Sequence, residues 1–252
     1  MTLYSHSRVK TFETCPLQYK FKYVDAIPEP VENIETFLGK RVHEVLEQLY
    51  RGLSPEVAAP ALKDLLATYR TAWDTNWRAE IRIVRRDAAH FYKSYGARCI
   101  ENLYNARAPF NQDTTLYLEQ YLEFPLGDAG THTMRGYADR ISIRRDGVYE
   151  IHDYKTSRRA MTQRDADADR QLSLYEIGLR NLHPEAKEIV LVWHFLNPRV
   201  TVRSRRTPER LNQIQRDTQT LINHIESETD FPAKKTALCD WCAYRGMCPA
   251  WS

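Results

Sequence analysis

Two neighbouring segments of the sequence, residues 136–143 and 148–155, constrain the fold more than any other feature. Both contain the β-branched and aromatic residues that strands favour, and the Asp146-Gly147 pair between them is typical of a tight hairpin turn. The two segments therefore predict an antiparallel β-hairpin.

The register of this hairpin decides which side chains meet. A three-residue loop, with Gly147 in the left-handed conformation, would place Asp139 opposite Asp153 with their Cβ atoms about 4.5–5.5 Å apart. A two-residue loop would shift the register by one residue and separate the two carboxylates. Because side chains alternate along a strand, Lys155 is expected on the same face as Asp153.

Two facing carboxylates repel each other, and a divalent cation such as Mg²⁺ or Mn²⁺ neutralises them in a half-buried site. A lysine beside that cation can stabilise an attacking hydroxide or a phosphate oxygen. Asp139, Asp153 and Lys155 therefore favour metal-assisted displacement at phosphorus. The alternative interpretation is purely structural: Asp139 belongs to an ordinary Asp–Arg pair on a surface strand, and Asp153 and Lys155 form cross-strand ion pairs.

Helical and strand patterns alternate along the rest of the 252 residues, which predicts the α/β class with a mixed sheet. Repeats and Gly/Ser-rich linkers are absent, so we expect one domain. The predicted helices cover residues 36–50, much of 54–104, 166–182 and 208–226, and further strands are predicted near 116–124, 189–196 and 200–202.

Composition narrows the class of protein. With 42% hydrophobic and 27% charged residues, the chain is typical of soluble globular proteins and not of collagen-like, disordered or membrane proteins. The absence of a run of about 18 apolar residues, together with a polar N-terminus, predicts a cytoplasmic protein with no membrane partner.

Local arginine clusters are better evidence for a polyanionic partner than the total charge, because 36 Lys+Arg against 33 Asp+Glu gives only +3. Arg158 and Arg159 follow Lys155 and are expected near the mouth of its site, unless they only solvate a helix start. Residues 82–86 hold the next cluster.

Five cysteines, an odd number without an export signal, make a disulfide framework improbable. Cys239, Cys242 and Cys248 crowd ten residues, and Cys15 is a candidate fourth thiolate from the other end of the chain. Four thiolates suit either Zn²⁺ or an iron–sulfur cluster, and the spacing does not separate the two. Unrelated free thiols are the alternative, and Cys99 is expected to be a buried free thiol.

Five motifs together resemble the PD-(D/E)XK nuclease superfamily, specifically its RecB-like branch. The hairpin carries two of them, Gly136-Tyr-Ala-Asp139-Arg-Ile and Asp153-Tyr-Lys155-Thr-Ser. The others, in the expected order along the chain, are the Ser-x-x-Lys-Thr-Phe-Glu-x-Cys-Pro-x-x-Tyr-Lys opening at 7–20, Gly39-Lys-Arg-Val-His43 and Gln171-Leu-Ser-Leu-Tyr175.

The resemblance implies a restriction-endonuclease-like core, a mixed β-sheet flanked by helices, within a single nuclease domain over residues 1–252. A helical insertion at about 52–112 and a cysteine-cluster tail at 231–252, clasped to the N-terminus, would complete it. The resemblance further implies a [4Fe-4S] cluster on Cys15, Cys239, Cys242 and Cys248, in place of the alternative structural Zn²⁺.

The same resemblance assigns roles to individual residues. Without the family, His43 would be interpreted as a structural histidine, and Gln171 and Tyr175 as a polar helix edge. Glu119 and Glu123, in the preceding strand, are open candidates for an additional carboxylate. By resemblance, the metal ligands are His43, Asp139, Asp153 and the carbonyl of Tyr154, the catalytic lysine is Lys155, and Gln171 and Tyr175 orient the site or hold DNA.

The predicted function is an Mg²⁺- or Mn²⁺-dependent deoxyribonuclease, an exonuclease on single-stranded ends in DNA repair, recombination or CRISPR adaptation. The alternatives are a structure-specific endonuclease and a non-catalytic DNA-binding or scaffolding module; the presence of Asp139, Asp153 and Lys155 argues against the latter. The sequence contains no phosphate-binding loop of a helicase motor, so unwinding would need a helicase partner. A CRISPR integrase is the other expected protein partner.

Overall fold

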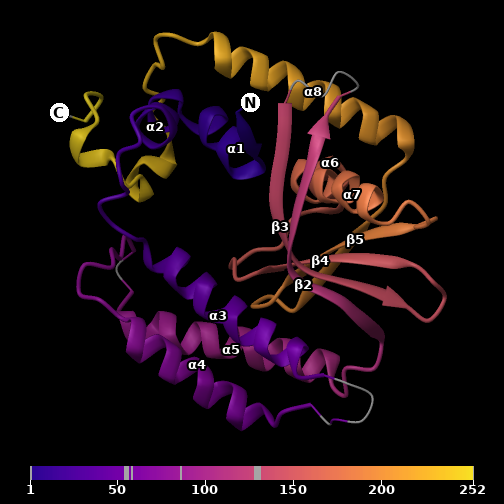
Figure 1. The fold of residues 1–252 in the computed structure, drawn as a ribbon. Coiled ribbons are helices and arrows are strands. Elements are labelled where there is room, and N and C mark those ends of the chain that lie inside the picture. The colour runs from indigo at the N-terminus through magenta and orange to yellow at the C-terminus, as the bar shows by residue number, and fades with distance from the viewer. Residues whose placement is uncertain (1, 54–56, 58, 86, 128–131, 252) are drawn as a thin grey trace.

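A six-stranded mixed sheet forms the centre of the computed structural model, which describes residues 2–53, 57, 59–85, 87–127 and 132–251 (Figure 1). Its strand order is β1-β3-β4-β5-β6, and β2 pairs with β3. The β1–β3 and β4–β5 pairs are parallel and the others antiparallel, which confirms the predicted class. The strands are β1 Leu3–Ser5, β2 Asp113–Leu126, β3 His132–Arg144, β4 Tyr149–Lys155, β5 Ile189–Phe195 and β6 Val200–Ser204.

Helices cover both faces of this sheet. The buried side chain of Tyr154 packs with helices α3 to α5, whereas Ile151 packs with α7, and their spacing on β4 puts them on opposite faces. No helix in the described part of the chain is long and apolar enough to span a membrane. The α-helices are α1 His6–Thr14, α2 Pro16–Tyr19, α3 Ile34–Arg51, α4 Leu62–Asn76, α5 Ala89–Arg107, α6 Gln163–Ala168, α7 Arg170–Leu182 and α8 Pro208–Ser227.

The hairpin of β3 and β4 has a three-residue loop, one of the two loop lengths that the sequence leaves open. Gly147 has φ 81°, and the amide of Arg144 donates to the carbonyl of Val148 at 2.9 Å. The ladder then continues from Ile143–Tyr149 to Arg140–His152 and ends there. The predicted register is confirmed, and Asp139 and Asp153 stand one step beyond the last paired residues.

Three features differ from the sequence prediction. The helix expected over 166–182 is broken at Asp169, because this side chain accepts a hydrogen bond from the amide of Leu172 and so caps a new helix, α7. The short strand β1 was not expected. The helical stretch expected over much of residues 54–104 is divided into two helices, α4 and α5.

Gly136 on β3 is required by the close approach of α7. A Cβ atom added at this position would lie 2.2 Å from Cε1 of Tyr175, far inside van der Waals contact. Two of the sequence motifs, the glycine of the hairpin and the tyrosine of α7, are therefore joined by one packing contact. This contact sets the distance of α7 from the strands that carry Asp139 and Asp153.

Substitution Gly136→Ala should push the ring of Tyr175 away and destabilise the fold. Overpacking of this kind costs about 1–3 kcal/mol, which corresponds to a melting temperature lower by about 2–10 °C for a chain of this length. Thermal denaturation measures the change. The control is Gly246→Ala, because a Cβ there has no neighbour within 4 Å. Equal melting of the two variants would contradict this packing constraint.

Candidate active site

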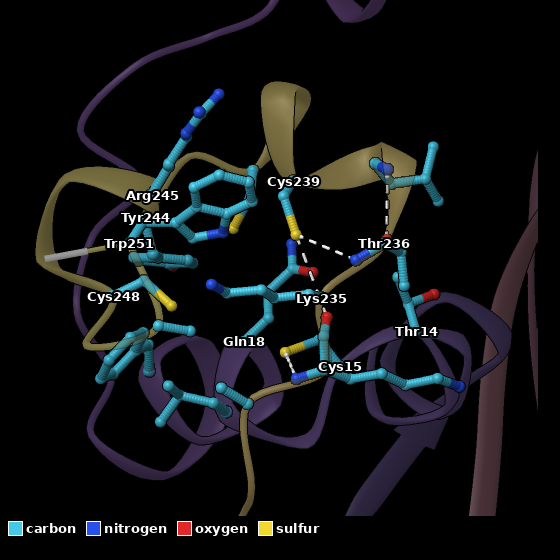
Figure 2. Close-up of a pocket in the computed structure, with 17 residues that line it drawn as sticks. Thr14, Cys15, Gln18, Lys235, Thr236, Cys239, Tyr244, Arg245, Cys248 and Trp251 are labelled. Atoms are coloured by element: carbon cyan, nitrogen blue, oxygen red, sulfur yellow. Dashed lines mark hydrogen bonds between the residues drawn. The ribbon is translucent and has the colours of Figure 1, made fainter.

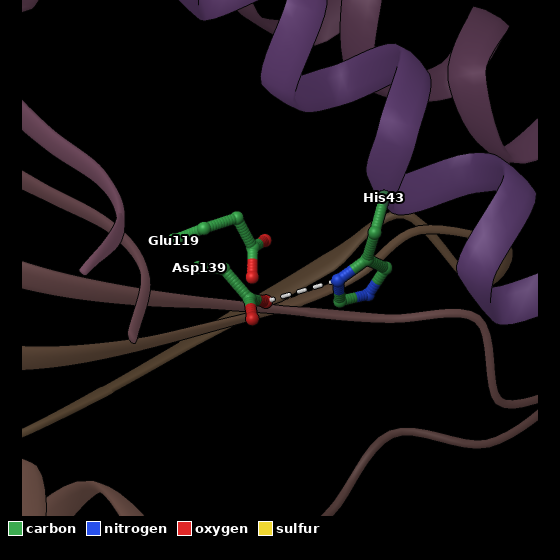
Figure 3. A group of neighbouring side chains, drawn as sticks. All are labelled: His43, Glu119 and Asp139. Carbon is green, nitrogen blue, oxygen red and sulfur yellow. Dashed lines mark ion pairs between the residues drawn. The ribbon is translucent and has the colours of Figure 1, made fainter. Parts of the chain in front are cut away.

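Three side chains from three elements converge at one edge of the sheet. His43 of α3, Glu119 of β2 and Asp139 of β3 each offer a ligand atom, and these atoms lie within 4.8 Å of one another (Figure 3). One imidazole nitrogen and two carboxylates form a donor set that suits a divalent metal ion.

The main chain of Tyr154 holds two members of this group in place. Its amide donates to Oδ2 of Asp139 at 2.8 Å, so this carboxylate occupies the space where the β3–β4 ladder would have continued. Its carbonyl lies 2.8 Å from Nε2 of His43. Because a carbonyl only accepts, Nε2 donates in this hydrogen bond, and Nδ1 lies 3.6 Å from Oδ2 of Asp139.

The carboxylates of the site lack enough positive charge around them. Burial raises the pKa of Asp139 to about 7 against the opposing effect of His43, and the nearby carboxylate of Asp153 raises it as well. Burial also raises the pKa of Glu119. Asp153 is instead paired, because Nζ of Lys155 lies 2.8 Å from its Oδ2. Asp139 and Glu119 therefore fit a site that is completed by a cation.

A second row of polar side chains runs from β4 to α7. Nζ of Lys155 donates to Oδ1 of Asp153 at 2.9 Å and lies 3.5 Å from Oε1 of Gln171, whose amide nitrogen is 3.4 Å from the hydroxyl of Tyr175. Burial lowers the pKa of Lys155, but Asp153 and then Asp139 outweigh it and raise the pKa above its ordinary value. Lys155 is therefore a fixed positive charge beside the carboxylates.

The structure thus brings all the sequence-predicted residues of this site into one region. It divides them into a group around His43 and Asp139 and a row that runs from Asp153 to Tyr175. Asp153 pairs with Lys155 and stands outside the group of His43, Glu119 and Asp139, although the resemblance implied that it is a ligand. The carbonyl of Tyr154 bonds to His43.

Glu119 is the member of the site that sequence reasoning left open. Its neighbours in β2, Leu118 and Gln120, pair with Arg140 and Ala138, so Glu119 lies opposite Asp139. Its φ of 45° is unusual in a strand. Glu123, the other candidate, is exposed and accepts from the hydroxyl of Tyr121. The spacing to Asp139 would have identified Glu119 only if the β2–β3 register had been known.

A second group with close ligand atoms consists of Asp113, Glu150 and His152. The guanidinium of Arg140 lies among them, 2.6 Å from Oδ1 of Asp113 and 2.9 Å from Nε2 of His152. A buried cation of the protein itself already balances this group, which makes it part of the core and not a metal site.

Four cysteines line one pocket where the two ends of the chain meet. Cys15 stands between α1 and α2, and Figure 2 shows its sulfur and those of Cys239 and Cys248 directed into one space. Burial raises the pKa of Cys242, and the other three cysteines add to the rise. Cys99 is fully buried elsewhere, as predicted, and burial raises its pKa to about 12.

Main-chain contacts join the two ends around these sulfurs. The amide of Lys234 donates to Sγ of Cys15 at 3.4 Å, and that of Thr236 donates to Sγ of Cys239 at 3.3 Å. The hydroxyl of Tyr244 donates to the carbonyl of Ile27 at 2.8 Å. N–H···S bonds of this kind favour the thiolate form, and the bond from Thr236 lowers the pKa of Cys239.

Comparison with known proteins identifies the family. The family model of the PD-(D/E)XK nuclease superfamily matches residues 3–249, so the chain belongs to this superfamily, whose members are nucleases that use divalent metal ions. No curated protein matches the sequence.

Two solved structures are among the matches, and the first of them is similar in fold. A protein from Eubacterium rectale described as a "Putative exonuclease" has a TM-score of 0.55 at 11% identity, covering 95% of this chain and 86% of its own. The crystal structure of SSO0001 has a TM-score of 0.42 at 17% identity, covering 86% of this chain and 96% of its own.

Glu119→Gln should weaken the binding of Mn²⁺ by about 10-fold or more, since it removes a charged ligand atom beside His43 and Asp139. Isothermal titration with MnCl₂ in the absence of nucleic acid measures this affinity. Glu123→Gln is the matched control, four residues away in the same strand, and should bind Mn²⁺ like the wild type. Equal affinities for the two variants would remove Glu119 from the metal site.

Proposed function

We propose that this chain is an Mg²⁺- or Mn²⁺-dependent deoxyribonuclease that hydrolyses phosphodiester bonds at single-stranded DNA ends. The observation that supports this best is the group of His43, Glu119 and Asp139 beside the ammonium of Lys155. Carboxylates short of positive charge next to a fixed lysine are the components of metal-assisted phosphoryl transfer.

His43, Glu119 and Asp139 would hold the metal ion, with Asp153 and the carbonyl of Tyr154 as the further ligands that the family resemblance implies. A bound Mg²⁺ or Mn²⁺ would supply Lewis-acid polarisation of a phosphate oxygen and a more acidic water. Lys155 donates to Asp153 and so presents its ammonium where negative charge grows on the phosphate. Gln171 and Tyr175 support Lys155 from α7.

The cysteines support assignment to the RecB-like branch with a [4Fe-4S] cluster. Four cysteines from the two ends of the chain line one pocket, and main-chain amides donate to the sulfurs of Cys15 and Cys239. A cubane, in which each thiolate binds a different iron, would use all four. Cys15, Cys239, Cys242 and Cys248 would hold this cluster.

The biological setting follows from the same branch. A role in DNA repair, recombination or CRISPR adaptation, with a helicase or an integrase as the protein partner, is the proposal that the resemblance to this branch implies. Action on ends, as opposed to structure-specific endonuclease activity, is the part that an assay with circular DNA tests directly.

Asp139→Asn, Asp153→Asn and Lys155→Ala should each lower the rate of cleavage by about 100-fold or more. Double variants should lose little further activity, because these groups act as a unit. The assay follows end-labelled linear and circular single strands with Mg²⁺ or Mn²⁺, and only the linear strand should be degraded. Asp217→Asn, on the exposed surface of α8, is the control. Wild-type cleavage by Lys155→Ala would overturn the site assignment, and rapid cleavage of circles would favour the endonuclease.

Anaerobically purified protein should be brown and contain about four irons per chain. Cys15→Ala should lower the iron content and the melting temperature, since the fourth thiolate joins the two ends of the chain. Cys99→Ala is the control and should keep its iron. Colourless protein with one zinc would contradict the cluster, and full iron in Cys15→Ala would exclude Cys15 as a ligand.

A further inference from the structure

Two grooves lead away from His43, and their charges are opposite. The first, here called the arginine groove, is lined by Arg85, Tyr92, Tyr95, Lys155, Ser157 and Arg158 between α3, α5 and the segment after β4. The second, the acidic groove, is lined by Lys40, Glu44, Glu47 and Glu119.

Charge favours the arginine groove as the path of a nucleic acid strand. Its lining has the cations of Arg85, Lys155 and Arg158, and its acidic side chain is Glu35, which accepts from the hydroxyl of Tyr92 at 3.3 Å. Phosphates would meet repulsion in the acidic groove and attraction here. Lys155 links the arginine groove to the proposed metal site.

Aromatic rings stand beside these cations at the rim. The guanidinium of Arg158 lies 5.2 Å from the ring centre of Phe91 and 6.0 Å from that of Tyr95. Phe91 itself is 38% exposed, on the helix α5. An exposed ring next to an arginine is the arrangement on which unpaired bases stack, whereas the bases of a duplex are already stacked on each other.

The arginine groove continues toward the cysteine pocket. The guanidinium of Arg85 lies 5.9 Å from the ring centre of Trp241. The main-chain carbonyl of Trp241 accepts from the side-chain Nδ2 of Asn33 at 2.8 Å. A further ring, that of Trp241, therefore lies beside the cation of Arg85.

Arg158 is held in an ion pair that a phosphate would replace. Oδ2 of Asp87 lies 2.7 Å from Nη2 of Arg158, and both side chains are partly exposed. An exposed ion pair of this kind contributes little to stability, so the guanidinium can change partners at small cost.

We propose that the arginine groove binds one strand of DNA, with a base stacked on Phe91 and phosphates at Arg85 and Arg158. This inference rests on the proposed nuclease function, because it takes the strand to the group of His43, Glu119 and Asp139.

The test is the affinity of the full chain for fluorescein-labelled oligo-dT, measured by anisotropy in EDTA so that no cleavage occurs. Phe91→Ala should weaken binding by about 5-fold or more. Arg158→Gln should reduce the log–log salt slope by about 0.7. Asp87→Asn should strengthen binding by about two- to fivefold, because it removes the competitor for Arg158. A gain of affinity cannot come from misfolding.

Two control variants match these changes. Arg205 forms an exposed ion pair with Glu188 on another part of the surface, so Arg205→Gln should leave the salt slope unchanged. Tyr137 is 56% exposed on β3, and Tyr137→Ala tests an aromatic outside the arginine groove.

The proposal that this groove binds DNA would be overturned if Phe91→Ala and Asp87→Asn both kept the wild-type affinity. It would also be overturned if Tyr137→Ala lost more affinity for oligo-dT than Phe91→Ala. Failure of the nuclease proposal is distinguishable from this result. It would appear as cleavage that does not depend on Lys155, whatever the groove variants do to binding in EDTA.

Discussion

A single buried charge, the guanidinium of Arg140, supports the arrangement of the site. Arg140 is fully buried, so its charge needs compensation inside the protein. Asp113 supplies that charge at 2.6 Å, the hydroxyl of Tyr154 accepts at 2.9 Å, and the ring of Tyr50 lies 4.3 Å away. These partners come from β2, β4 and α3. Removal of one partner of a buried pair typically costs about 3–5 kcal/mol, so Arg140 fixes how these three elements meet.

Tyr154 transmits this constraint to the candidate metal site. Its hydroxyl is held by Arg140, while its amide and carbonyl contact Asp139 and His43. On the same face, burial and then Arg140 keep the pKa of His152 well below its ordinary value, so this imidazole stays neutral. The positive charge of the core therefore remains on Arg140, and the carboxylates on the other side of Tyr154 stay short of positive charge, as a metal site requires.

The sequence predicted the features that depend on local chemistry. The Asp146-Gly147 pair marked the hairpin turn, because turn preferences act over a few residues, but it left two registers open. The structure has the register that places Asp139 opposite Asp153. Glu119 could not be chosen over Glu123, since its place depends on an irregular β2 strand. The exposure of Phe91 and the helix break at Asp169 also depend on which other parts of the chain pack against these positions. A helical sequence pattern carries no information about those contacts.

Helix α3 connects the cysteine tail, the candidate metal site and the buried Arg140. Asn33 precedes the helix. Its side-chain Nδ2 donates to the carbonyl of Trp241, and its side-chain Oδ1 accepts from Nε of Arg82. His43 lies in the middle of the helix, and Tyr50 near its end contacts Arg140. A helix of 18 residues is stiff over this length. The loop of the cysteine tail, held at the start of α3 through Asn33, and the candidate active site at His43 therefore share one stiff element.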